Sequence, residues 1–163
     1  MPPDDDRLSF ARRTAVAELV CRSALCLDGR DFDGYLALCD EAFDYRITAW
    51  SPEIRRQMTW LAHDRAGLAT LFANLPRHHS DASPLSRHVT VYTVAPAAAG
   101  PGQDVVSALQ VFRTRLDGGA TELFAVGKQF DHVVAGPDGA PRLRAREIRL
   151  DTRMLGYGHH IPF

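Results

Sequence analysis

The sequence predicts an α+β fold in which helices near the N-terminus pack on one face of a curved, mostly antiparallel sheet. In the first half of the chain, apolar residues recur at helical spacing. After residue 86 the chain consists of long runs rich in β-branched and aromatic residues, separated by turn sequences. Helices followed by an antiparallel meander are typical of the α+β class. A strongly bent sheet closed by helices makes a cone, which permits ligand binding without implying catalysis.

Two helices are predicted first. Apolar residues at helical spacing predict one from Leu8 to Leu27. Asp28-Gly29-Arg30 ends it, and Gly29 is expected to take the left-handed conformation that helix ends favour. Asp31 is the expected cap of a second, shorter helix. The buried face of that helix is predicted to contain Phe32, Tyr35, Leu36 and Cys39.

A hairpin and a third helix are predicted next. Strict alternation from Phe43 to Ala49 predicts a half-buried strand, which Ser51-Pro52 ends. Residues 56–61 are expected to pair back with it. Asp64 is the expected cap of a third helix that ends before Pro76, and polar residues 77–84 are expected to form a loop.

The second half of the chain predicts four long strands. They are separated by segments rich in Gly, Pro and Asp, which are typical of turns. The predicted strands are Arg87–Val94, Val105–Arg115, Glu122–Val134 and Arg142–Thr152.

Bulk composition favours one soluble domain, residues 1–163, with residues 1–10 flexible. The formal net charge of −1 gives no reason to expect nucleic acid or an anionic membrane as partner. No apolar run approaches the roughly 20 residues that span a bilayer. Three cysteines do not form a disulfide framework, and the acidic N-terminus does not resemble a signal peptide. A cytoplasmic location is therefore expected.

Six segments, in order, resemble the β subunits of Rieske-type ring-hydroxylating oxygenases. A seventh, Ile47–Arg56, is similar to the small subunits of alkanesulfonate (methanesulfonate) monooxygenases within that family. The six are Asp28–Tyr45, Leu61–Arg65, Ser86-Arg87-His88, Val111–Arg115, Leu123–Lys128 and Arg144–Asp151.

This resemblance implies a cystatin-like α+β roll and a structural, non-catalytic subunit. It implies a β trimer within an α3β3 oxygenase that hydroxylates an aromatic acid or an alkanesulfonate. The α partner is expected to carry a Rieske [2Fe–2S] cluster and a mononuclear iron. This chain is expected to hold no cofactor.

The sequence lacks the Cys and His patterns that typical metal sites of oxygenases require. A Rieske cluster needs two Cys and two His at short spacing, but the three cysteines lie at helical apolar positions without a nearby histidine. The pairs His78-His79 and His159-His160 consist of neighbours, which point to opposite faces of a strand. No metal site is therefore predicted.

An alternative interpretation is a stand-alone isomerase or dehydratase of a ketosteroid-isomerase-like cone fold. His88 and Asp64 would transfer protons, with Tyr45 and Asp28 beside them. A third possibility is a binding module whose cone holds an apolar ligand without turnover. Against catalysis, His88 and Arg87 can instead make structural or subunit contacts.

Two further features are expected at subunit interfaces. Arg142, Arg144 and Arg146 are predicted to share one strand face, which is either an anion site, a solvated face, or a set of ion pairs across a subunit boundary. The C-terminal residues 153–163 are apolar for a terminus and are expected to dock, on their own core or on a neighbouring subunit. The candidate interface residues are Arg87, Arg144, Arg146, Tyr157, Ile161 and Phe163.

Overall fold

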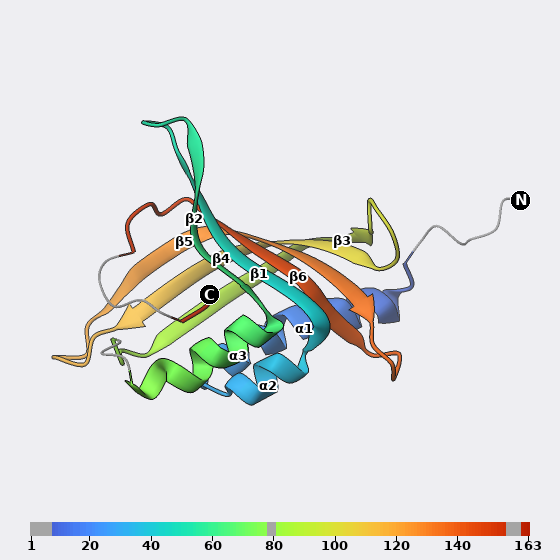
Figure 1. Ribbon diagram of the computed structural model, residues 1–163, viewed down its shortest axis with the longest axis horizontal. Coiled ribbons are helices and arrows are strands. Elements are labelled where there is room, and N and C mark those ends of the chain that lie inside the picture. The colour runs from blue at the N-terminus through green and yellow to red at the C-terminus, as the bar shows by residue number, and fades with distance from the viewer. Residues whose placement is uncertain (1–7, 78–80, 156–160) are drawn as a thin grey trace, which may run out of the picture.

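The computed structural model describes residues 8–77, 81–155 and 161–163, and it confirms the α+β class (Figure 1). Each predicted helix and strand is present. The helices are α1 (Phe10–Asp28), α2 (Phe32–Ala37) and α3 (Arg65–Asn74), which continues into the 3-10 turn η1 (Leu75–Arg77). The strands are β1 (Cys39–Ser51), β2 (Arg56–Asp64), β3 (Leu85–Pro96), β4 (Gln103–Thr114), β5 (Thr121–Ala135) and β6 (Pro141–Leu150).

One curved sheet contains the six strands in the order β2-β1-β6-β5-β4-β3. Every neighbouring pair is antiparallel except β1 and β6, which run parallel in the middle of the sheet. The β1–β2 hairpin projects beyond the body of the sheet, at the top of Figure 1. The sheet is therefore a meander, β3 to β6, whose last strand is flanked by the earlier hairpin.

The helices cover one face of the sheet, which we call the inner face (Figure 1). α1 packs mainly on β3, and α3 packs on β1 and β2. Alternate residues of β5 are buried, from Ala125 through Gln129 to Val133, as expected for a strand with one covered face. The described helices include none long and apolar enough to cross a membrane.

Side-chain caps fix the starts of the helices. Asp31 accepts a hydrogen bond from the Gly34 amide (2.9 Å) and Asp64 accepts one from the Gly67 amide (2.7 Å), which confirms both predicted caps. Ser9 caps α1, which begins at Phe10. Of the ten residues expected to be flexible, residues 1–7 lie outside the described part, but Ser9 and Phe10 belong to the start of α1.

Two local predictions were wrong. Gly29 keeps a right-handed conformation (φ −78°), and the left-handed residue at the end of α1 is Arg30 (φ 54°). The reason is that the Gly29 amide still bonds to the Leu25 carbonyl, so the chain turns one residue later. Cys39 does not lie on α2 but begins β1, because α2 ends at Ala37.

Candidate functional site

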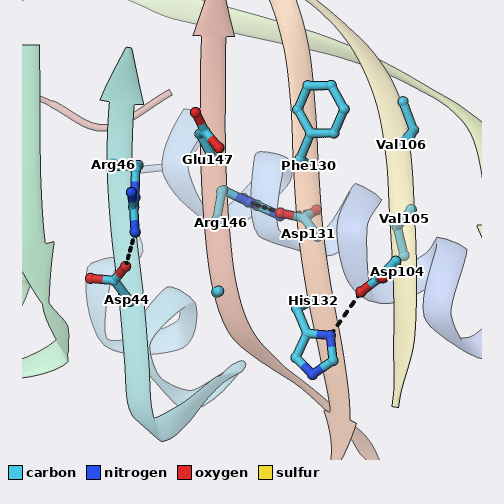
Figure 2. Close-up of a pocket in the computed structure, with 11 residues that line it drawn as sticks. Asp44, Arg46, Asp104, Val105, Val106, Phe130, Asp131, His132, Arg146 and Glu147 are labelled. Atoms are coloured by element: carbon cyan, nitrogen blue, oxygen red, sulfur yellow. Dashed lines mark hydrogen bonds and ion pairs between the residues drawn. The ribbon is translucent and has the colours of Figure 1, made fainter. Parts of the chain in front are cut away.

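The cone contains a buried ion pair on its inner face. The Arg146 guanidinium donates to both carboxylate oxygens of Asp131, at 2.7 and 3.0 Å, across the β5–β6 pair (Figure 2). The two side chains are only 1% and 0% exposed. Gln129 donates to the same carboxylate at 2.7 Å. Burial acts to lower the pKa of Arg146, but Asp131 outweighs it and holds the pKa above its ordinary value.

A second buried arginine joins three parts of the chain. Arg87, at the start of β3, donates from its guanidinium to Asp28 at the end of α1 (2.6 Å). Its backbone amide donates to the same carboxylate at 3.0 Å. Its other terminal nitrogen donates to the carbonyl oxygen of Pro162 (2.6 Å). The side chain is 2% exposed, so this clamp is internal to the chain.

The described C-terminal residues Ile161–Phe163 lie inside the cone. Ile161 is 7% exposed and Phe163 1%. The Tyr45 hydroxyl accepts a hydrogen bond from the Phe163 amide (2.9 Å) and donates one to the Phe163 backbone oxygen (3.3 Å). The Phe163 ring lies 6.1 Å from the Phe124 ring, centre to centre. Burial raises the pKa of Tyr45, so its hydroxyl stays neutral at physiological pH.

The C-terminal segment was expected to dock either on its own core or on a neighbouring subunit. The described residues of the segment pack into the chain's own core. In Figure 1 the C-terminus lies between the sheet and the helices. Tyr157, the remaining residue predicted to dock, lies outside the described residues.

The four residues of the proton-transfer alternative are not brought together. His88 is exposed on the outer face, 3.2 Å from the Ser86 hydroxyl and edge-on to the Phe112 ring. Asp64 is exposed and caps α3. Only Tyr45 and Asp28 belong to the inner site, where both serve the C-terminal segment, Asp28 through Arg87.

The arginines of β6 do not share one face. Arg144 is 47% exposed and pairs with Asp40 at 2.8 Å, whereas Arg146 points inward to Asp131. The β5–β6 pairing shifts register between His132 and Val133, and this irregularity reverses the alternation along β6. Within the described chain, Arg87, Arg146, Ile161 and Phe163 are all buried against their own chain rather than presented at its surface.

Asp131 and Gln129 were not predicted as site residues. A usable signal was present, because both stand at the alternating buried positions of the β5 run, between Ala125 and Val133. A charged residue at such a position needs a buried partner.

The outer face of the sheet carries a broad, open groove of about 480 Å³. Figure 2 shows its lining, which includes a hydrogen bond between His132 and Asp104 (2.8 Å). The buried Asp131 and Arg146 also border this groove, although their side chains are almost fully buried. Phe130 and Glu147 lie beside it, and Arg149 stacks 4.0 Å from the Phe130 ring centre. Polar and apolar groups thus alternate on this face, with no converging catalytic set among the groove's residues.

Metal ligands do not converge in the described residues, where no group of three or more His, Cys, Asp or Glu side chains could hold an ion. Cys21 is exposed on α1, and Cys39 is buried, which raises its pKa to about 12. These side chains do not fit a Rieske cluster or a mononuclear iron. Both predicted histidine pairs, His78-His79 and His159-His160, lie outside the described residues.

Residues 22–156 match the family model of the ring-hydroxylating β subunit. The chain belongs to this family. It is 42% identical over 155 residues to the β subunit of the methanesulfonate monooxygenase hydroxylase of Methylosulfonomonas methylovora, covering 91% of this chain and 85% of the relative. It is 33% identical to the β subunit of 2-aminobenzenesulfonate 2,3-dioxygenase of an Alcaligenes species, covering 91% and 97%.

The fold is shared with solved oxygenase structures. A chain of naphthalene 1,2-dioxygenase superposes with a TM-score of 0.77 at 16% identity, covering 96% of this ring-hydroxylating β subunit and 86% of that chain. The similarities confirm the predicted family and fold, and they support the oxygenase-subunit interpretation over the stand-alone isomerase.

Proposed function

We propose that this chain is the structural β subunit of a Rieske non-haem iron oxygenase whose substrate is an organic sulfonate. The observation that carries the proposal is the similarity to two β subunits that belong to enzymes named for sulfonates, an alkanesulfonate and an arylsulfonate. The resemblance of the Ile47–Arg56 segment to alkanesulfonate monooxygenase small subunits supports the same branch of the family.

The partner is an oxygenase α subunit, which carries the Rieske cluster and the mononuclear iron. Family membership supports this pairing. The β subunits form a trimer within an α3β3 assembly, which keeps the cluster of one α subunit near the iron of its neighbour. In this role the functional residues of the β chain are contact residues, and a substitution among them changes assembly before it changes chemistry.

The projecting β1–β2 hairpin is the best-supported contact surface. Three large apolar side chains are exposed on it: Trp50 (58%), Ile54 (59%) and Trp60 (45%). Aromatic side chains are enriched at protein interfaces, and two of these three are tryptophans. Arg144 on β6 is exposed and pairs with Asp40 on β1, and it remains a candidate contact on the outer face.

The test is co-expression of this chain, tagged, with its candidate α subunit. We expect a large complex of two polypeptides with iron, and oxygen uptake with methanesulfonate or 2-aminobenzenesulfonate well above that with benzoate. Recovery of only an iron-free homo-oligomer would contradict the assembly role. A complex that oxidises benzoate but neither sulfonate would contradict the substrate class alone.

A pair of variants tests the contact surface. Trp60→Arg is expected to reduce the recovered α subunit several-fold. The same change at Leu116, which is 69% exposed in the β4–β5 turn, serves as the matched control. Equal recovery from both variants would place the interface elsewhere.

A further inference from the structure

The Ile161–Phe163 segment is held as a bound peptide would be held. It lies in no helix or strand, and its contacts come from residues far away in the sequence. Arg87 on β3 and Tyr45 on β1 bind its backbone, while Phe124 on β5 lies beside its aromatic ring. The three hydrogen bonds that Arg87 and Tyr45 make with the segment involve main-chain atoms of Pro162 and Phe163. Such bonds recognise a backbone path, and the buried ring adds side-chain selectivity.

Polar groups at this place are costly unless they have partners. A buried guanidinium loses its hydration, and desolvation lowers the pKa of Arg87 even though Asp28 opposes the shift. An apolar side chain of similar size would fill the same volume without that cost. We therefore infer that Arg87 and Tyr45 serve to recognise the backbone of the segment that occupies this place.

The site also has unused hydrogen-bonding capacity. Among the described residues, the Arg87 Nε and the Tyr35 hydroxyl are buried without a hydrogen-bond partner. Tyr35 is 0% exposed and packs edge-on to Phe43, which in turn packs against Tyr45. Buried polar groups usually find partners, so these two are unsatisfied hydrogen-bond donors in the interior of the cone.

We propose that the inner face of the cone is a binding site for an apolar peptide segment of the form X-Pro-aromatic, and that Ile161–Phe163 is its resident ligand. The specificity has two parts. Arg87 and Tyr45 take the two backbone positions around proline, and the apolar core beside Phe124 takes the aromatic ring. A segment of the same chemistry supplied from outside competes for the site when the resident segment is weakened.

The test uses the full chain with its two buried anchors removed, Ile161→Gly/Phe163→Gly. Acetyl-Ile-Pro-Phe-amide is titrated at millimolar concentrations while the midpoint of thermal unfolding is followed. We expect a saturable rise of the midpoint, as for any ligand that binds the folded state alone. The unaltered chain and a Met154→Ala variant, changed at an 85% exposed side chain, should not respond, because their own segment fills the site.

Selectivity separates this site from non-specific adhesion. Acetyl-Ile-Pro-Ala-amide should bind at least about tenfold more weakly, since it lacks the buried ring. Adding Tyr45→Phe to the double variant should weaken the Phe peptide by about fivefold to tenfold, the value of the lost hydrogen bonds. A folded double variant that ignores the Phe peptide, or binds both peptides equally, would overturn the proposal.

If the double variant does not fold, Phe163→Ala takes its place. It leaves a ring-sized apolar space, and such cavities bind small aromatic molecules. Toluene should then raise the unfolding midpoint of Phe163→Ala but not of the unaltered chain, and no rise in either would overturn the proposal. The assays need only this chain, so they can fail while the oxygenase assignment stands.

Discussion

Replacing Arg146 by methionine should destabilise the chain far more than the same change at Arg144, two residues earlier on β6. The two side chains differ in surroundings rather than in type. Arg146 is 1% exposed and makes two short hydrogen bonds to the fully buried Asp131. Arg144 is 47% exposed and makes one ion pair with Asp40.

The magnitude follows from the charge that is left behind. Arg146→Met leaves the Asp131 carboxylate buried in the cone, where Gln129 is its one remaining side-chain donor among the described residues. Breaking a buried pair in this way costs about 3–5 kcal/mol. For a chain of this length the unfolding midpoint should fall by about 6–20 °C. Arg144→Met removes a largely solvated pair, and its expected cost is below about 1 kcal/mol.

Removing both charges together should restore much of the stability. In Arg146→Met/Asp131→Leu no unpaired charge remains, and apolar replacements of buried pairs are often neutral or stabilising. Urea unfolding followed by circular dichroism gives the four free energies of the double-mutant cycle. If the double variant is less stable than either single variant, or Arg146→Met loses no more than Arg144→Met, the argument from an unpaired buried charge is refuted.

Three more predictions concern the tail, the thiols and the hairpin. Tyr45→Phe should cost about 1–2 kcal/mol and speed hydrogen exchange at the Phe163 amide, because two hydrogen bonds to that residue are lost; unchanged exchange would contradict the contact. In the native chain at pH 8 a thiol reagent should modify the exposed Cys21 quickly and Cys39 only after unfolding, since burial raises the pKa of Cys39 to about 12. Hydrogen bonds from Arg153, from the Glu53 backbone and from Ser51 lower the pKa of Glu53 to about 2. The stabilisation from the Glu53–Arg153 ion pair should therefore be lost only as pH falls from about 4.5 toward 2. An NMR titration of Glu53 should show that midpoint, and Arg153→Ala should raise it.

The order and type of the elements could be predicted because each has a local signal. The caps Asp31 and Asp64 stand directly before apolar helical faces, and the second half alternates between β-rich runs and turn residues. What failed was the placement of single residues. Arg30 rather than Gly29 takes the left-handed position, because one more helical hydrogen bond forms than the glycine signal suggests.

The faces of β6 show why side-chain positions are harder to predict. Strict alternation places Arg144 and Arg146 on the same side, and only the register shift against β5 separates them. Such an irregularity depends on the pairing of two strands and has no signature in either strand alone. The two arginines consequently differ completely in role, although the sequence presents them as equivalent.

The failure of the proton-transfer alternative has the same physical origin. Adjacent residues of a strand point to opposite faces, so Arg87 and His88 cannot both enter the cone. The choice between them depends on Asp28, 59 positions earlier, which accepts from both the backbone and the guanidinium of Arg87. Once Arg87 is inside and bound to Pro162, His88 is fixed on the outer face, far from the Tyr45 hydroxyl in sheet position. The residues that could have served a substrate in the cone, Tyr45 and Arg87, instead bind the chain's own C-terminal segment.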